Sequence, residues 1–168
     1  MRKLSAVKTN TPNSLSKWYK IKNPFRVIWN FLLIFLSKYC PSLSIKRFLL
    51  RLTGMKVGKN VSVGLMVSFD IFWPELIELK DNCLIGFNST ILAHEFLIKE
   101  YRTGKVVIGK NVLIGTNSTV LAGVEIGDNS VIGAMSLVNS DVPSNSFFAG
   151  VPARLLKKGR LQFNSKRN

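Results

Sequence analysis

The chain has little of the residues that build disulfides and metal sites. Its 168 residues include one histidine, two cysteines and nine acidic residues. Cys40 and Cys83 cannot form the dense disulfide framework of a small secreted domain. One histidine excludes a zinc site built from three histidines of one chain, and two cysteines give no alternative set of metal ligands. We therefore expect a cytoplasmic protein without a catalytic metal.

The chain also lacks an apolar run long enough to cross a bilayer. Residues 25–39 are largely apolar, but a spanning helix needs about 20 apolar residues, and Arg26 and Asn30 shorten this stretch further. No small-residue cleavage site of the signal-peptide type follows it. A second, amphipathic stretch begins after Pro41. We expect a helical segment over residues 23–54 that caps a neighbouring structure, which we favour, lies in an anionic bilayer interface, or does both.

Acidic residues are absent from both ends of the chain, whose net charge is +15. Residues 1–60 contain thirteen Lys and Arg and residues 151–168 contain six, without a single Asp or Glu. We expect residues 1–22 to form a flexible basic N-terminus and residues 151–168 a basic tail. Such a charge would suit nucleic acid, but neither a helical reader motif nor the aromatic and glycine pattern of an RNA module is present. We therefore predict no nucleic-acid partner.

What the sequence does contain is a six-residue repeat. Aliphatic residues recur at this spacing at Ile108, Ile114, Val120, Ile126, Ile132 and Val138, and glycine follows four of them. The same frame runs upstream through Leu79, Ile85 and Ile91, and before that through Val57, Val63 and Phe69. A fixed short period over about half of a chain indicates a solenoid.

The repeat also predicts regular corners. Three residues after nearly every aliphatic position stands a residue that tolerates a left-handed turn, namely Asn60, Asn82, Asn88, Asn111, Asn117, Gly123, Asn129 and Asp141. The next residue is usually small or β-branched, as a narrow inward site requires. Three short strands and three corners close a coil of eighteen residues, which predicts a parallel β-helix over residues 55–150. The alternative, a β-sandwich, would show a period of two and wider turn spacing.

Two insertions break the frame, and insertions in a solenoid become loops that often carry the binding face. The first lies between Phe69 and Leu79 and contains an aromatic pair, Phe72 and Trp73. The second is predicted to form an arm at residues 97–107 that projects from the prism.

His94 stands at a corner position just before the predicted arm, so its side chain should point away from the packed interior. Glu95 takes a site that is small in other coils, which predicts a local distortion. A lone histidine usually has no chemical duty, but an imidazole with a pKa near ~6.5 is suited to remove a proton from a hydroxyl. Glu95, Asp70 or a backbone carbonyl could orient the ring, and the sequence does not choose among them.

The repeat, together with the segments IGAMSLV at 132–138 and FAGVPAR at 148–154, resembles the hexapeptide-repeat acyltransferases, above all the maltose, galactoside and xenobiotic O-acetyltransferases. This resemblance implies an all-β fold: a left-handed parallel β-helix of hexapeptide repeats with an N-terminal helical segment and a projecting loop. It also implies a homotrimer with three sites between subunits. Compared with the maltose and galactoside enzymes, the run that leads to the histidine is two residues shorter here.

The resemblance implies roles for individual residues as well. In similar enzymes a histidine just ahead of a projecting loop is the catalytic base, which makes His94 the candidate here and Glu95 its neighbour in the catalytic site. Contacts to acetyl-CoA are implied for Thr116, Ala134, Asn139, Arg154 and Lys157, the last two near the nucleotide phosphates. The candidates for binding the acceptor are Ser68, Asp70, Tyr101 and Arg102.

These expectations combine into an acetyl-CoA-dependent O-acetyltransferase that acts on a hydroxyl of a saccharide or surface-polysaccharide precursor by direct transfer. One alternative is acyl transfer from an acyl carrier protein, since a basic surface would suit an acidic partner. The other is a non-catalytic trimeric scaffold that binds no acetyl-CoA. The basic and apolar N-terminus would also allow peripheral contact with the inner face of the membrane.

Overall fold

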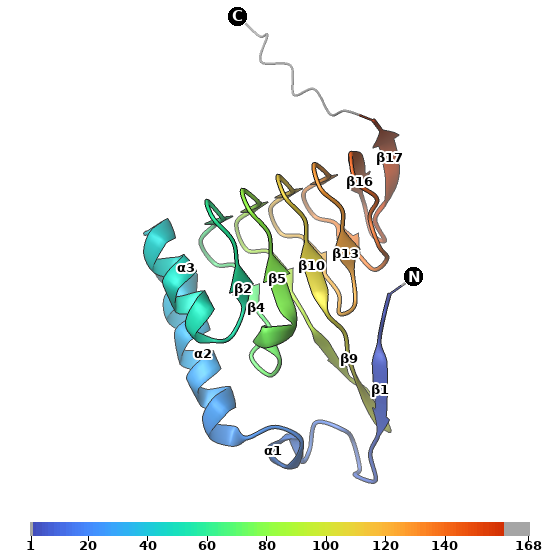
Figure 1. Cartoon of the computed structure of the whole chain (residues 1–168). Helices are drawn as coiled ribbons and strands as arrows, with labels where there is room; N and C mark the ends of the chain where they lie inside the picture. Colours follow the sequence, from blue (N-terminus) through green and yellow to red (C-terminus); the bar gives the residue numbers. More distant parts are fainter. Residues whose placement is uncertain (1, 160–168) are drawn as a thin grey trace, which may run out of the picture.

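A computed structural model describes residues 2–159, whose body is a three-sided prism of stacked coils (Figure 1). Each side is a sheet of parallel strands. The first sheet holds β2 (Lys56–Val57), β5 (Ile77–Leu79), β10 (Val106–Ile108) and β13 (Glu125–Ile126). The second holds β3 (Ser62–Val63), β6 (Leu84–Ile85), β11 (Leu113–Ile114), β14 (Val131–Ile132) and β16 (Ser146–Ala149). The third holds β4 (Ser68–Phe69), β7 (Thr90–Ile91), β12 (Thr119–Val120) and β15 (Leu137–Val138). The parallel β-helix predicted from the period of six is confirmed.

The core of the prism is a set of aliphatic columns, one inside each side. On the second side, Ile85, Ile114 and Ile132 lie opposite one another in successive coils and are fully buried. Burying one such side chain contributes about 1.5–3 kcal/mol, so the repeated columns supply the main stabilisation of the prism. The small inward sites are filled as predicted, and their hydroxyls find backbone partners: Ser118 Oγ donates to the Gly133 carbonyl at 3.0 Å.

The corners of the coils adopt the predicted left-handed backbone in seven of eight positions. These seven are Asn60, Asn82, Asn88, Asn111, Asn117, Gly123 and Asn129, with φ between 54° and 77°. Asp141 is not among them, and its carboxylate instead accepts a bond from the backbone N–H of Glu125 at 2.9 Å. The corner amides also bond along the prism, as Asn82 Nδ2 does to Asn111 Oδ1 at 2.8 Å. Local turn chemistry therefore also links neighbouring coils.

Both insertions leave the prism at the same edge, between the third and first sheets. The first follows β4 and contains a short 3₁₀ helix, η1 (Pro74–Leu76). The second follows β7 and is a hairpin of β8 (His94–Phe96) and β9 (Glu100–Thr103), which forms the arm. Because β4 and β7 pair directly, the two insertions lie side by side, one coil apart.

The arm begins three residues earlier than the range 97–107 expected from the sequence. Val106 and Val107 belong to β10, because the buried side chains of Val106 and Ile108 fill the two inward positions of that coil. Glu95 consequently lies on the arm and not in an inward site, so no coil is distorted to hold it.

The described parts of both terminal segments contain strands, which the sequence did not lead us to expect. Within residues 1–22, β1 (Ser5–Lys8) pairs antiparallel with β9, and α1 (Trp18–Ile21) follows. Pairing with the edge of the arm orders this segment, an interaction that its basic and polar sequence does not reveal. At the other end β17 (Arg154–Lys158) pairs antiparallel with β16, and the rest of the expected tail lies outside the described residues.

Two helices close the first coil as a cap, the arrangement that we favoured from the sequence. They are α2 (Pro24–Tyr39) and α3 (Leu43–Leu52). On α3, Lys46 donates to the Gly64 carbonyl at 2.6 Å, and Arg51 donates to the Val57 carbonyl at 2.8 Å and 3.0 Å. Burial lowers the pKa of the Lys46 ammonium. These bonds satisfy carbonyls that the first coil would otherwise leave unpaired.

The buried thiol of Cys83 gives a first testable prediction. Cys83 is 1% exposed, and burial raises its pKa to about 12, so it stays a neutral and unreactive thiol. Iodoacetamide at about pH 8 should therefore alkylate the partly exposed Cys40 in the folded protein and both cysteines after unfolding. Mass spectrometry of the labelled Cys40→Ser variant is the control. Rapid labelling of this variant while folded would contradict the buried position of Cys83.

Candidate active site

His94 lies at the foot of the arm, where β8 leaves the prism. Its Nδ1 bonds to Oδ2 of Asp70, the residue that follows β4 in the preceding coil. The His94 side chain is 14% exposed, whereas that of Asp70 is completely buried. Asp70 is therefore the residue that orients the imidazole, a choice that the sequence left open.

The Asp70 carboxylate collects donors from both insertions. Oδ1 accepts the backbone N–H groups of Phe72 at 2.8 Å and Trp73 at 2.9 Å, and Oδ2 accepts that of Ala93 at 2.8 Å as well as His94 Nδ1. Burial acts to raise the pKa of Asp70, but the His94 bond and the backbone donors outweigh it and hold the pKa below its ordinary value. An ionised Asp70 keeps the proton on His94 Nδ1 and leaves the Nε2 lone pair available as a base.

Aromatic side chains surround the His94 ring. The ring centroids of Phe96, Phe72 and Trp73 lie 4.7, 5.0 and 5.2 Å from that of His94. Tyr101 of β9 stacks on Trp73, with centroids 5.6 Å apart and planes at 17°. The first insertion and the arm therefore build one apolar wall around the imidazole. Phe96 was missed from the sequence, although its spacing of two from His94 on a strand places both side chains on one face.

Two candidates from the sequence lie outside this cluster. Neighbouring residues of a strand face opposite ways, so Glu95 points away from the side that carries His94, and it forms an ion pair with Arg2. Arg102 donates through Nε to Glu100 Oε1 at 2.7 Å. Glu95 thus links the arm to the N-terminal segment, Arg102 bonds within β9, and neither is bonded to the imidazole.

The remaining candidates border the third sheet. Ser68 lies half-buried on the outer side of β4, and Asn139 follows β15 at the same edge as Asp70. Thr116 and Ala134 are exposed at the opposite edge of this sheet, in adjacent coils. The coils approach so closely here that a Cβ on Gly115 would lie 2.4 Å from the Ala134 nitrogen, so only glycine fits.

The basic candidates Arg154 and Lys157 are exposed on β17, next to the last coil. Within one chain, the candidate site residues thus lie in three places: the edge with His94, the edge with Thr116 and Ala134, and the terminal strand β17. They line no common cavity.

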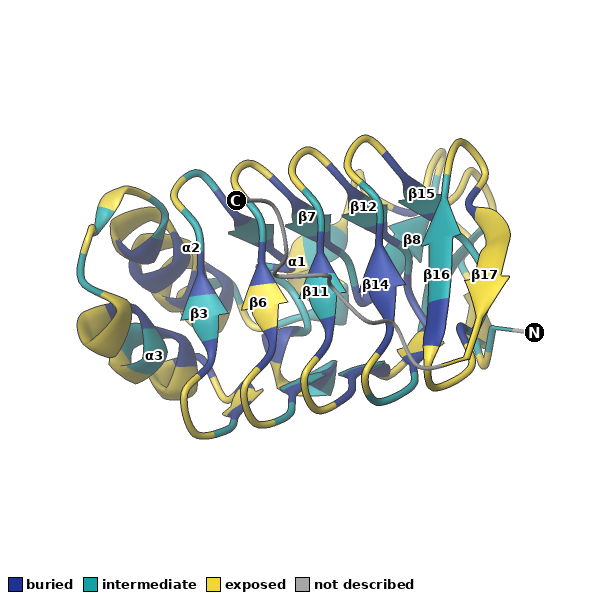
Figure 2. Ribbon diagram, turned by 90° about the horizontal axis from the view of Figure 1, so that it is seen from above, coloured by how far each residue is buried: buried dark blue, intermediate teal, exposed yellow. Residues whose placement is uncertain are grey.

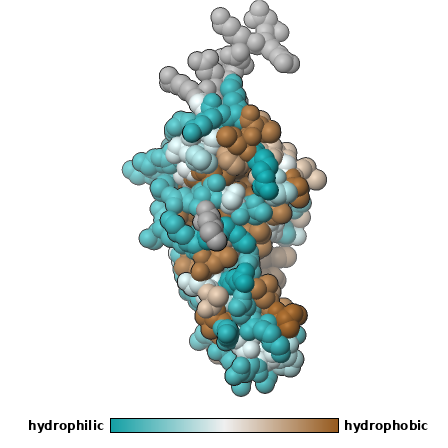
Figure 3. Space-filling view, turned by 90° about the vertical axis from the view of Figure 1, so that its right-hand side faces the viewer, coloured by the Kyte–Doolittle hydropathy of each residue, from teal (hydrophilic) through white to brown (hydrophobic). Residues whose placement is uncertain are grey.

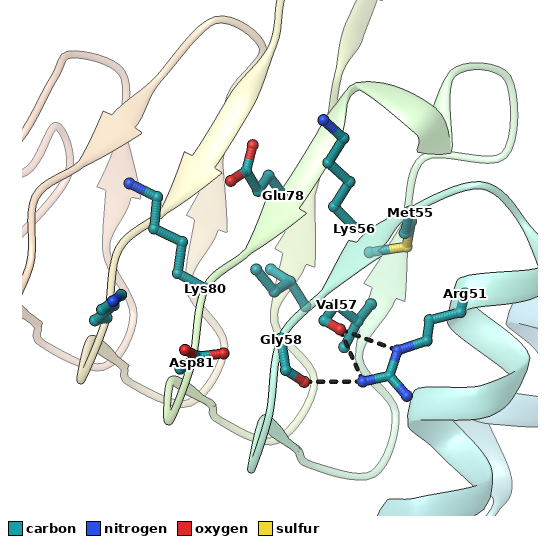
Figure 4. A pocket seen from close by; sticks show the side chains of 10 residues that line it. Arg51, Met55, Lys56, Val57, Gly58, Glu78, Lys80 and Asp81 are labelled. Carbon is teal, nitrogen blue, oxygen red and sulfur yellow. Dashed lines mark hydrogen bonds between the residues drawn. The ribbon is translucent and has the colours of Figure 1, made fainter.

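A cavity of about 580 Å³ lies elsewhere, on the outer side of the first sheet beside α3 (Figure 4). Its charged lining comprises Arg51, Lys56, Glu78, Lys80, Asp81 and Lys110. It contains no imidazole to take a hydroxyl proton, so we do not place acyl transfer there. Among residues 2–159, no three His, Cys, Asp or Glu side chains come together as a metal-binding group.

Comparison with known proteins decides the family. Residues 105–140 match the family described as "Bacterial transferase hexapeptide (six repeats)". The chain is 46% identical over 157 residues to "Putative acetyltransferase YvoF" of Bacillus subtilis (strain 168), an alignment that covers 93% of this chain and 91% of that one. This chain belongs to the hexapeptide-repeat acetyltransferases. The resemblance seen in its repeats is thereby confirmed, and so is its class as an acyltransferase.

Two further similarities concern galactoside enzymes. This acetyltransferase is 42% identical over 112 residues to galactoside O-acetyltransferase of Escherichia coli (strain K12), which covers 60% of this chain and 55% of that one. A solved structure of galactoside acetyltransferase in complex with coenzyme A superposes with a TM-score of 0.65 at 28% identity, covering 80% of this chain and 81% of that chain.

Proposed function

We propose that this enzyme transfers the acetyl group of acetyl-CoA to a hydroxyl of a saccharide or surface-polysaccharide precursor, with His94 as the general base. The observation that carries the proposal is the buried Asp70 carboxylate on Nδ1 of a partly exposed His94. The similarity to galactoside acetyltransferase, whose solved structure contains coenzyme A, supports both the donor and the class of acceptor.

The proposed reaction proceeds by direct transfer. Nε2 of His94 takes the proton of the acceptor hydroxyl while its oxygen forms a bond to the thioester carbon. The resulting imidazolium is stabilised by the ionised Asp70. When the tetrahedral intermediate collapses, the carbon–sulfur bond breaks, and the leaving coenzyme A thiolate takes the proton from His94. Tyr101 and Ser68 would contact the acceptor from the arm and from β4.

The proposed assembly is a homotrimer of left-handed prisms with acetyl-CoA in the groove between two subunits. A groove that needs two subunits would explain why the candidates lie on two edges and a terminal strand of one chain. Thr116, Ala134 and Asn139 would line the pantetheine, and the charges of Arg154 and Lys157 would pair with the nucleotide phosphates. We place the enzyme in the cytoplasm. Among the helices of residues 2–159, none could span a bilayer.

Ligand-induced stabilisation tests the donor without knowledge of the acceptor. Acetyl-CoA should raise the melting temperature in a saturable way, since a ligand at a hundred times its Kd adds about 2.7 kcal/mol to the free energy of unfolding. Ala134→Trp should remove this shift by blocking the groove, whereas Leu65→Trp, at the matching corner of the first coil, should keep it. A shift with an acyl carrier protein alone would favour that donor. No shift with acetyl-CoA, coenzyme A or carrier protein would favour the scaffold.

A further inference from the structure

The side of α2 that faces away from the prism is apolar along its whole length. Its large exposed side chains are Phe25, Ile28, Trp29, Phe31, Leu32, Phe35, Leu36 and Tyr39, and Ile45, Phe48 and Leu52 of α3 are exposed beside them. We call these eleven residues the helical outer face. The two helices pack on each other, and Trp29 Nε1 donates to the Leu52 carbonyl at 3.5 Å, so the face is continuous.

The helical outer face is too large to be incidental. Aromatic and aliphatic side chains of this size, about half exposed, add up to on the order of 600 Å² on α2 alone, which reaches the size at which exposed apolar patches mark interaction sites. Figure 2 shows the two helices at one end of the prism with many exposed residues. At the opposite end, which carries β1 and β17, hydrophilic side chains are interspersed with hydrophobic ones (Figure 3).

The helical outer face belongs to a segment of the chain whose charged side chains are all basic. Residues 1–60 contain thirteen Lys and Arg and no acid. Lys17 and Lys20 are exposed at α1, immediately before α2, and Lys38 lies in its last turn. An apolar helix face with aromatic residues and flanking lysines fits an interface that is both apolar and anionic.

We propose that the helical outer face docks on an anionic lipid bilayer, with α2 in the plane of the membrane. The 16 residues of α2 extend for about 24 Å, less than the roughly 30 Å of a hydrocarbon core, so the helix suits an in-plane position. Trp29 and Tyr39 have the amphipathic rings that favour the boundary between headgroups and acyl chains.

A second copy of the chain is a less suitable occupant of the same face. Two copies that met through it would bring their acid-free basic segments together, and the like charges would oppose association. The face also closes one end of the prism, away from the three flat sheets against which neighbouring prisms could pack (Figure 1).

Docking would bring the bilayer close to the active site. On the inner side of α2, Asn30 Nδ2 donates to the Ile71 carbonyl at 3.0 Å, and the next residue, Phe72, packs on His94. A saccharide held at the membrane surface would then lie within reach of the base. This consequence rests on the proposed function, whereas the docking itself does not.

Vesicle co-sedimentation of the full-length protein tests the docking. The protein should pellet with mixed phosphatidylglycerol and phosphatidylcholine vesicles, less with phosphatidylcholine alone, and less at high salt. Leu32→Glu/Leu36→Glu should weaken binding by on the order of tenfold to a hundredfold, because two apolar side chains no longer insert. The matched control is Leu155→Glu/Leu156→Glu on β17, since the exposures are 49% and 56% for the first pair and 49% and 62% for the second.

The control variant adds the same negative charge at the opposite end of the prism and should bind like the wild type. Melting temperatures of both variants establish that they are folded, independently of the vesicles. Absence of wild-type pelleting, or equal loss in both variants, would overturn the proposal. So would a larger assembly in solution that only Leu32→Glu/Leu36→Glu dissociates, because the face would then join two copies.

Discussion

Replacing His94 with alanine should lower kcat for acetyl transfer by about 10²–10⁴-fold, the usual contribution of a positioned general base. The variant keeps every group proposed to contact acetyl-CoA, so the thermal shift with that ligand should remain. Coenzyme A release, followed with a thiol reagent in the presence of an acceptor saccharide, gives the rate. A loss of kcat with intact donor binding assigns the chemistry to the imidazole.

Glu95→Gln provides the matched control for His94→Ala. Glu95 is the next residue on β8, yet it faces the other way and pairs with Arg2, so its loss should change kcat by only a few-fold. If His94→Ala retained wild-type turnover, or if Glu95→Gln removed it to the same extent, the assignment of the base would be wrong.

The repeat made most of the prism predictable from the sequence. An aliphatic residue every six positions predicts a buried column, and Asn or Gly three positions later predicts a left-handed corner. The strands, corners and inward sites could therefore all be predicted from the same repeat. Asp141 shows the limit of the rule. It has the right spacing, but its carboxylate finds a bond to the Glu125 nitrogen and its backbone does not turn left-handed.

The insertions were found from the sequence, but the boundaries of the arm were not. The six-residue frame constrains only the residues that pack inside the prism. It therefore could not show that the coil ends before Glu95 or that it continues from Val106. The pairing of β1 with β9 was also missed, because Ser5–Lys8 carries no pattern and contacts the arm mainly through its backbone. Such pairing depends on where a distant edge strand lies, which a local sequence does not encode.

The repeat could have predicted that Asp70 and His94 lie close together. Phe69 and Ile91 lie one coil apart with four extra residues between them, which stacks Asp70 next to Leu92 and therefore close to His94. Only the folded structure shows that the carboxylate turns inward and bonds to the ring. Glu95, adjacent in sequence, was an equal candidate until the alternation of β8 placed it on the other side.

Asp70→Asn should reduce kcat by about 10²–10⁴-fold, because an amide cannot stabilise the imidazolium or hold the proton on Nδ1. The amide oxygen can still accept a backbone N–H bond, so the first insertion should remain folded. Measured turnover should therefore fall while the acetyl-CoA shift persists. Unchanged turnover would show that Asp70 only anchors the loop that carries Phe72 and Trp73.

The pH dependence of stability separates a charge effect at Asp70 from a loss of packing. Its pKa is held below the ordinary value, mainly by His94 against the opposing effect of burial. A carboxyl with a lowered pKa in the folded state stabilises the protein above its unfolded pKa of about 3.9, and this contribution disappears as the pH falls through the folded pKa. The wild type should thus be more stable than Asp70→Asn at neutral pH, and the difference should shrink below about pH 4. A difference that stays constant well below pH 4 would mean that shape, and not the ionised carboxylate, holds the imidazole in place.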